Sequence, residues 1–249
     1  MKPSLALAAA ALVAACSAST VLAQADYARE ERLAQETMSG IVVGDAVRLE
    51  LEPGRRVLAL YTPAPRAASG VVLVHGLGVH PDWGLIGVLR VQLAEQGYAT
   101  LSVQMPVLRA GAGADRYEPL FPEAAARLDA AVAWLRGKGL KKIAIVSHSM
   151  GARMTNHFLN QAGHAPIDAW VAIGIGEFVR PQDFRAPVLD VYGENDFPAV
   201  LEQAPARAAA IRKIRGSGQM QAAGADHFFT GREGELARQT RQFLDSRLK

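Results

Sequence analysis

Residues 142–151 read Lys-Ile-Ala-Ile-Val-Ser-His-Ser-Met-Gly. The apolar body, residues 143–146, is typical of a central parallel strand that is buried on both faces. Ser149 follows it just before a predicted helix, so we expect a sharp strand-to-helix turn that lifts the serine hydroxyl above the sheet and directs helix N–H groups towards an anion beside it. Such a turn needs small residues two positions before and after the serine. Gly151 meets this requirement fully and Ser147 approximately.

Strands and helices alternate on both sides of this turn. Strands are expected at residues 42–51, 55–61, 70–74, 99–103, 142–147, 169–175, 187–192 and 219–222. Helices are expected at residues 83–96, 123–136, 150–162, 199–214 and 232–247. The first two strands flank a Pro-Gly pair and should form an antiparallel hairpin, while residues 26–38 are expected to be an exposed N-terminal segment. The alternation predicts an α/β fold with a mainly parallel central sheet and helices on both faces, which binds ligands at the carboxyl ends of its strands.

Two residues at predicted strand ends suit a serine that must be activated. A serine hydroxyl is a poor nucleophile until a base takes its proton, and the base needs a partner that fixes its tautomer and orientation. Asp196 follows a strand and His227 lies in a loop before the last helix, so we expect Ser149, His227 and Asp196 to meet in series. Other candidates remain for each role: Asp183, Asp190 and Glu194 as the acid, and His148, His157 and His164 as the base. Asp190 lies inside a strand, and His148 is expected to point away from Ser149.

A second loop could supply backbone donors for the oxyanion that forms when a serine attacks a carbonyl carbon. Directly after the apolar strand at residues 70–74, His75 begins a His-Gly-Leu-Gly stretch at the same edge of the predicted sheet. We expect the N–H groups of Leu77 and Met150 to bind the oxyanion. Gly76 and Gly78 would permit the close approach of this loop, and His75 would support it rather than act as the base.

With these residues in view, the chain resembles the α/β-hydrolase superfamily over nearly all of its length after the leader. It is similar to small serine esterases and to an uncharacterised branch of exported bacterial hydrolase-like proteins, which share the His-Gly-Leu-Gly stretch and the Pro-Asp-Trp at residues 81–83. The chain order Ser, Asp, His is the order of that superfamily. The resemblance implies these roles: Ser149 as nucleophile, His227 as base, Asp196 as its orienting acid, and Leu77 and Met150 as oxyanion donors.

The resemblance also implies a reaction class but no substrate, because the superfamily covers esterases, lipases, lactonases, peptidases and dehalogenases. We expect a serine hydrolase that cleaves a carboxylic ester or lactone through an acyl-enzyme, without a cofactor. Ser147 stands where the family usually has glycine. This departure keeps open a catalytically weak or inactive envelope protein that acts as a binding or scaffold module. Residues 108–122 are expected to form a modest cap, and Phe197 and Phe228 are candidates for lining an acyl pocket.

The N-terminus is predicted to be a leader for export. Residues 5–15 are an unbroken run of Leu, Ala and Val, eleven residues long, which is shorter than the ~20 apolar residues that span a bilayer. We expect a signal peptide over residues 1–23 and a single hydrolase domain over residues 24–249. A competing lipobox would end at Cys16 and leave a lipid anchor there. The protein is therefore expected to be periplasmic or secreted, with an outer-membrane lipoprotein as the alternative and no membrane span.

Composition excludes other classes of protein. The 249 residues are 50% hydrophobic with a formal charge of +3, which allows a sizeable core and excludes a disordered chain. His75 and His80 lie near each other without further ligand residues, so no metal site is expected. Four basic residues without interleaved aromatic residues are interpreted as a solvated helix face rather than a nucleic-acid site: Arg207, Arg212, Lys213 and Arg215.

Overall fold

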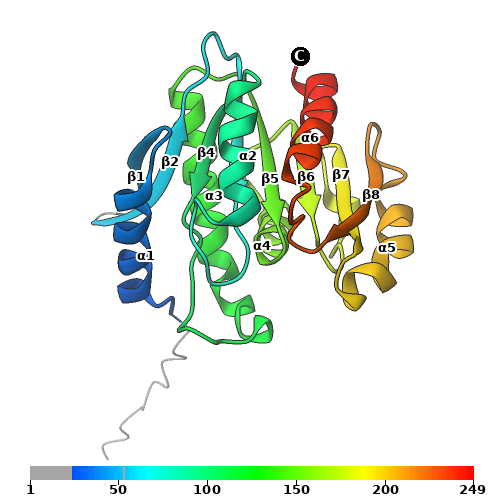
Figure 1. Cartoon of the computed structure of the whole chain (residues 1–249), viewed down its shortest axis with the longest axis horizontal. Helices are drawn as coiled ribbons and strands as arrows, with labels where there is room; N and C mark the ends of the chain where they lie inside the picture. The colour runs from blue at the N-terminus through cyan, green and yellow to red at the C-terminus, as the bar shows by residue number, and fades with distance from the viewer. Residues whose placement is uncertain (1–23, 53) are drawn as a thin grey trace, which may run out of the picture.

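The computed structural model describes residues 24–52 and 54–249, in which eight strands form one sheet (Figure 1). The strands are β1 (Asp45–Glu52), β2 (Arg55–Thr62), β3 (Ser69–Val74), β4 (Ala99–Val103), β5 (Lys142–His148), β6 (Ala169–Ile173), β7 (Val188–Asn195) and β8 (Gly218–Asp226). The helices are α1 (Tyr27–Gly40), α2 (Gly84–Glu95), α3 (Phe121–Gly137), α4 (Met150–Leu159), α5 (Pro198–Ile211) and α6 (Glu233–Leu248). Short 3-10 helices lie at Ala114–Arg116, Glu118–Leu120 and Pro181–Asp183.

The order of strands across the sheet is β1-β2-β4-β3-β5-β6-β7-β8. β2 pairs antiparallel with β1 and with β4, and every other neighbouring pair is parallel. The predicted architecture, a mainly parallel sheet that begins with an antiparallel hairpin, is confirmed. Parallel strands require crossovers through helices, and the carboxyl ends of β3, β5, β6, β7 and β8 therefore point to the same edge of the sheet.

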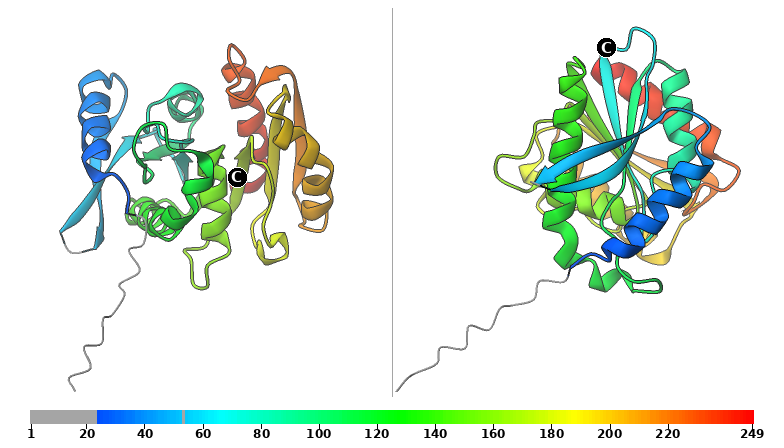
Figure 2. Two further views of the ribbon diagram at one scale, coloured as in Figure 1. Left: turned by 90° about the horizontal axis from the view of Figure 1, so that it is seen from below. Right: turned by 90° about the vertical axis from the view of Figure 1, so that its left-hand side faces the viewer.

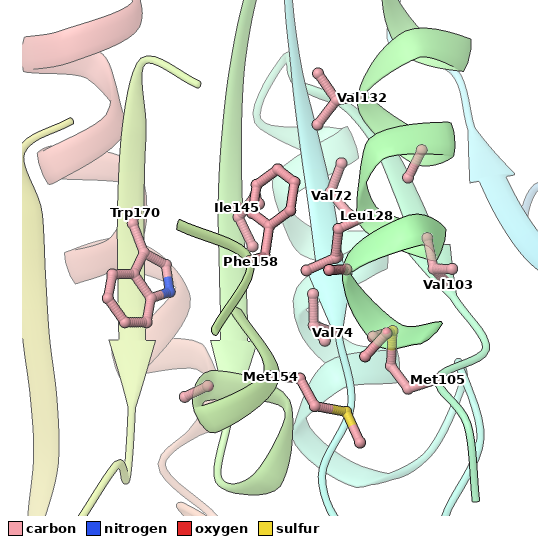
Figure 3. Packing of buried hydrophobic residues seen from close by; sticks show 14 of the residues in the cluster. Val72, Val74, Val103, Met105, Leu128, Val132, Ile145, Met154, Phe158 and Trp170 are labelled. Carbon is pink, nitrogen blue, oxygen red and sulfur yellow. The ribbon is translucent and has the colours of Figure 1, made fainter. Parts of the chain in front are cut away.

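Helices cover the sheet on both faces, with α2 and α6 on one side and α3 and α4 on the other (Figures 1 and 2). Successive side chains of a strand point to opposite faces, so both faces of the central strands need apolar residues. Val72 and Ile145 pack with Leu128 of α3 and Phe158 of α4, as Figure 3 shows. The alternate residues of β3 and β5 pack in the other layer with α2 and α6. This two-sided burial explains the continuous apolar runs of these strands.

The N-terminal segment differs from the prediction. Instead of an exposed tail, it forms α1, which begins where the side chain of Asp26 accepts the N–H of Arg29 at 2.9 Å. Ala34 is buried against Leu58 of β2. Glu30 is buried and pairs with the fully buried Arg127 of α3 at 2.9 Å. The prediction was wrong because the buried face of α1 is narrow and partly charged, and its main partner lies 97 residues away.

The basic cluster also differs from the prediction. Arg207 is 2% exposed, and its guanidinium lies 2.9 Å from the buried carboxylate of Asp190 in β7. Arg212, Lys213 and Arg215 are exposed, as expected. A buried arginine needs such a partner, since an unpaired charge is very costly to desolvate. Arg207 is therefore part of the link between α5 and β7 rather than of a solvated face.

The predicted signal peptide and the lipobox at Cys16 lie outside the described residues. Among residues 24–52 and 54–249, no helix combines the length and the apolar character that a membrane span requires.

Candidate active site

Ser149 lies at the sharp turn between β5 and α4. Its backbone has φ 55° and ψ −118°, a conformation that costs a residue with a side chain about 1–3 kcal/mol. The Ser149 N–H donates to the carbonyl of Ile173 at 2.8 Å, which fixes the turn to the end of β6. A Cβ on Gly151 would lie only 2.4 Å from the carbonyl oxygen of His75, so this position has room for glycine alone. The surrounding structure thus holds a strained serine at the carboxyl end of a central strand.

The structure brings Ser149, His227 and Asp196 together from the ends of three strands. His227 Nδ1 lies 2.6 Å from Asp196 Oδ1, and His227 Nε2 lies 2.9 Å from Ser149 Oγ. His227 and Asp196 are 3% and 5% exposed, so both hydrogen bonds are shielded from water. Each side chain directly follows a strand: Ser149 follows β5, Asp196 follows β7 and His227 follows β8.

The ionisation state of Asp196 decides which atoms donate and which accept in the hydrogen bonds that join Asp196, His227 and Ser149. Burial alone would raise the pKa of Asp196, but hydrogen bonds from His227 and from the N–H groups of Phe197 at 2.7 Å and Gly193 at 3.2 Å outweigh it and lower the pKa. The carboxylate is therefore ionised near neutral pH and accepts the Nδ1–H of His227. This tautomer leaves the Nε2 lone pair free to accept the hydroxyl proton of Ser149.

The loop that follows β3 lies beside Ser149. A Cβ on Gly76 would lie 3.5 Å from the Cβ of Ser149, so the backbone of this loop passes close to the serine. The N–H of Leu77 has no hydrogen-bond partner within the described residues. Met150 is the first residue of α4, where N–H groups lack partners inside the helix. Both N–H groups are available to a ligand at Ser149.

His75 supports the same loop from inside the protein. Its Nε2 accepts the N–H of Met105 at 2.9 Å, so its Nδ1 carries the proton and donates to the carbonyl of Gly76 at 2.9 Å. Burial lowers the pKa of His75 to about 3, which keeps the ring neutral. Because a peptide unit is planar with its C=O and N–H trans, holding the Gly76 carbonyl also sets the direction of the Leu77 N–H.

Sequence comparison now assigns the family. The model of the alpha/beta hydrolase family matches residues 71–247, which include all three hydrogen-bonded side chains. The chain belongs to the alpha/beta hydrolase family. A second family model, described as a protein of unknown function (DUF3530), matches residues 4–125. No curated protein matches the sequence.

Solved structures share the fold of this hydrolase. Dienelactone hydrolase from Anabaena variabilis has a TM-score of 0.69 at 19% identity, over 82% of this chain and 98% of that chain. An esterase from Pyrococcus furiosus has a TM-score of 0.65 at 16% identity, over 84% and 97% of the two chains. A serine hydrolase without a lid from Xanthomonas campestris has a TM-score of 0.60 at 16% identity, over 83% and 95%. At these identities the similarity establishes the fold.

The other candidate acids and bases of this hydrolase lie elsewhere or have other partners. Asp190 is paired with Arg207, and Glu194 accepts the N–H of Gly224 at 2.8 Å. Asp183 lies in the 3-10 helix Pro181–Asp183, where its carboxylate is 3.8 Å from Arg180. His157 contacts Gln161, and His164 contacts the carbonyl of Ala165. None of these side chains contacts Ser149.

His148 has a contact that the sequence did not predict. Its Nε2–H donates to the carbonyl of His227 at 2.9 Å, and the two ring centroids are 4.8 Å apart. The sequence missed this contact because the two residues are 79 positions apart. Burial, together with the nearby His227, lowers the pKa of His148 to about 4. His148 is therefore a neutral donor that holds the backbone of the catalytic histidine candidate.

The burial of His148 and His75 predicts how the stability of the hydrolase depends on pH. The pKa of His148 is about 4 in the folded chain and 6.5 ordinarily, so between these values the unfolded chain binds more protons. The free energy of unfolding should therefore fall as the pH drops from 6.5 to 4, by up to roughly 3 kcal/mol for this group. His75, with a folded pKa of about 3, acts in the same direction. The lowered pKa of Asp196 contributes only below its ordinary value of 3.8.

Urea denaturation at pH 7 and pH 4.5 measures this effect. The variant His148→Gln keeps a side-chain donor for the carbonyl of His227 but cannot titrate, so its stability should change less between the two pH values. The raised pKa values of the buried Glu30 and Asp190 act in the opposite direction in both proteins, so the difference between wild type and His148→Gln is the test. An equal change of stability in the two proteins would contradict the role of His148.

Ser147, which replaces the usual glycine of the hydrolase turn, has a specific partner. Its side chain is fully buried, and its hydroxyl accepts the indole N–H of Trp170 at 2.8 Å. Trp170 lies on the neighbouring strand β6 and is itself fully buried among Phe178 and Phe184. The serine at this position thus satisfies a buried donor that a glycine would leave unpaired.

Ser147→Gly should therefore destabilise the protein. The unpaired indole N–H of Trp170 is expected to lower the free energy of unfolding by about 1–3 kcal/mol. Thermal or urea denaturation of Ser147→Gly measures the loss, and Trp170→Phe provides the matched background because it has no N–H. In the Trp170→Phe background, Ser147→Gly should lower the free energy of unfolding by less than it does in wild type. An equal loss in both backgrounds would show that the hydrogen bond is not the cause.

Apolar side chains border the hydrogen-bonded residues. The ring of Phe197 stacks on His227 with centroids 4.1 Å apart, and the ring of Phe228 meets His227 edge-on at 5.2 Å. Phe197 is 51% and Phe228 53% exposed, and Leu77 on the loop after β3 is 39% exposed. The rings of Phe197 and Phe228 are themselves 6.2 Å apart, so they expose apolar surface side by side next to His227. The predicted cap, residues 108–122, lies over α4, where Arg153 donates to the carbonyl of Ala114 at 3.4 Å.

Proposed function

We propose that this hydrolase is a serine hydrolase that cleaves a carboxylic ester or a lactone through an acyl-enzyme intermediate. The observation that carries the proposal is the continuous hydrogen-bond chain from Ser149 Oγ through His227 to the ionised Asp196. This arrangement of nucleophile, base and orienting carboxylate is recognised by its geometry on many folds. Here it occurs at the carboxyl ends of the strands, where ligands bind in α/β sheets.

In the first half of the proposed reaction, Ser149 Oγ attacks the carbonyl carbon of the substrate as its proton passes to His227 Nε2. Asp196 stabilises the imidazolium that forms. The negative charge moves to the carbonyl oxygen, where the N–H groups of Leu77 and Met150 would donate to it. When this tetrahedral intermediate collapses, His227 returns the proton to the leaving oxygen, and the alcohol departs while the acyl group stays on Ser149.

In the second half, His227 takes a proton from a water molecule that attacks the acyl carbon. The resulting intermediate collapses, Ser149 Oγ leaves and recovers its proton from His227, and the carboxylic acid is released. With a lactone, the alcohol formed in the first half stays attached to the acyl chain, so one hydroxy acid leaves at the end. The cycle consumes one water molecule and needs no cofactor.

Two observations favour an ester or lactone with an apolar group. The exposed rings of Phe197 and Phe228 next to His227 offer an apolar surface for an acyl or aryl group. Among the structures with the same fold are a dienelactone hydrolase and an esterase, whose names denote cleavage of a lactone and of esters. The inactive scaffold gains no support, because Ser147, the residue that suggested it, has a partner in Trp170.

Labelling with a fluorophosphonate probe tests the proposal, because the probe phosphonylates activated serines. Wild-type protein should form one adduct, and Ser149→Ala none. Ser39→Ala is the matched control, since Ser39 is an exposed serine on α1 and its loss should leave labelling unchanged. An adduct on folded Ser149→Ala, or none on folded wild type, would refute the role of Ser149.

We also propose that the protein is exported, on the basis of the predicted leader at residues 1–23. Mass spectrometry of the mature N-terminus distinguishes the two forms of processing. A chain that begins at Gln24 supports cleavage after Ala23, whereas an acylated Cys16 at the N-terminus supports a lipoprotein. A cellular protein that retains Met1 would refute export by either route.

A further inference from the structure

The side chain of Arg29 connects the N-terminal helix α1 to the loop beside Ser149. The guanidinium of Arg29 donates through one nitrogen to the carbonyl of Gly78 at 2.7 Å and through the other to the carbonyl of Leu108 at 2.6 Å. These carbonyls belong to two loops, one after β3 and one after β4. Arg29 therefore joins both loops to α1. Hydrogen bonds from a charged donor of this kind are stronger than those between neutral groups.

The helix that carries Arg29 is itself held firmly. The Asp26 N–H donates to the carbonyl of Val107 at 2.8 Å, and the Val107 N–H donates to the carboxylate of Glu30 at 3.3 Å. Glu30 is paired in turn with the buried Arg127, which also donates to the carbonyl of Gln104 at 2.8 Å. The start of α1 is thus bonded to the segment after β4 at several points. A guanidinium on a helix that is anchored in this way can fix the positions of the carbonyl groups that it binds.

The bond from Arg29 complements the one from His75. His75 holds the peptide unit between Gly76 and Leu77, and Arg29 holds the peptide unit that follows Gly78, so Leu77 and Gly78 lie between two fixed peptide units. Gly78 has φ +66°, and a Cβ there would lie 3.4 Å from the hydroxyl of Tyr117, which also accepts the Leu108 N–H at 3.2 Å. The loop is therefore held from both sides in a conformation that leaves the N–H of Leu77 without a partner in the described part of the chain.

We propose that Arg29 is a positioning residue that holds the loop of residues 75–78 so that the Leu77 N–H faces the oxyanion. The inference rests on the proposed function and extends it to a helix outside the match to the alpha/beta hydrolase family, which begins at residue 71. α1 thereby becomes part of the catalytic apparatus rather than an accessory to the sheet. Arg29 touches neither the substrate nor the reacting atoms and acts only through the loop.

Arg29→Ala tests this role by steady-state kinetics with a short p-nitrophenyl ester. An oxyanion donor acts in the transition state, so kcat should fall while KM stays nearly constant. The loss should be on the order of tenfold, below the ~10²–10³-fold that follows full removal of a donor. Arg29→Lys keeps the charge but only one of the two hydrogen bonds at a time. Its kcat should lie between those of Arg29→Ala and wild type. Arg32→Ala is the matched control, because Arg32 is an exposed arginine on the same helix.

Rescue with millimolar guanidinium separates positioning from a general loss of structure. Arg29 is half-buried, so a free guanidinium ion can reach its place in Arg29→Ala and should raise kcat severalfold, whereas sodium chloride at the same ionic strength should not. A kcat of Arg29→Ala within twofold of wild type would overturn the inference. A loss of kcat that guanidinium does not reverse would overturn it too, since that pattern indicates a structural defect. Wild-type protein without ester hydrolysis would instead overturn the proposed function, and the inference with it.

Discussion

Ser149→Ala is expected to lower kcat for ester hydrolysis by about 10⁴- to 10⁶-fold without a change of fold. Alanine has no hydroxyl to attack the carbonyl carbon, but it is as strained as serine at φ 55° and ψ −118°, so the turn gains no relief and the stability should change little. Hydrolysis of a p-nitrophenyl ester measures the loss, and urea denaturation checks that the variant is folded.

The residual rate decides between a nucleophilic and a merely binding role for Ser149. The residual rate is expected to exceed the uncatalysed rate by up to ~10³- to 10⁴-fold, because the oxyanion donors and the binding surface remain. Ser149→Ala activity within tenfold of wild type would mean that another group attacks the substrate. The control Ser39→Ala should have wild-type activity.

Asp196→Asn is expected to lower kcat by about 10³- to 10⁴-fold. The amide keeps the shape of the carboxylate, but its NH₂ group favours the tautomer of His227 that carries its proton on Nε2. That nitrogen can then no longer accept the proton of Ser149, although the 2.9 Å contact between them persists. The variant should therefore bind substrate normally and react slowly.

Asp183→Asn is the matched control for this prediction. Asp183 is a partly exposed acid in a 3-10 helix, and within the described part of the chain its carboxylate pairs with Arg180, so its loss should leave kcat unchanged. Equal activity of Asp196→Asn and wild type would remove Asp196 from the mechanism. Because Asp196 also accepts two backbone N–H groups, circular dichroism should accompany the kinetics to establish that the loop after β7 is intact.

Most of the fold could be predicted because its signals are local. The apolar run of β5 and the small residue at Gly151 are neighbours of Ser149 in the chain, and together they define the turn. The continuous apolar runs of β3 and β5 predicted strands that are buried on both faces, which the packing of α2, α3, α4 and α6 confirms. Ser149, Asp196 and His227 could be proposed together because each follows a strand that ends at the same edge.

What the sequence did not predict depends on contacts between distant residues. Arg29 and Glu30 of α1 and Arg127 of α3 look like solvated charges until the fold places α1 beside α3 and the loop after β3. His148 contacts the carbonyl of His227 across 79 residues, and Arg207 lies buried against Asp190 of another element. A charged residue carries no local mark of burial, because the same side chain suits water or a partner that only the tertiary structure supplies.

Acyl transfer to Ser149 tests the central claim most directly. Wild-type protein mixed with a p-nitrophenyl ester and quenched in acid within the first turnovers should carry one acyl group, and fragmentation of the tryptic peptide that contains residues 143–153 should place it on Ser149. The acyl group should be absent from His227→Ala treated in the same way. An acyl group on another residue of active wild-type protein, or its formation at the wild-type rate without His227, would contradict the account.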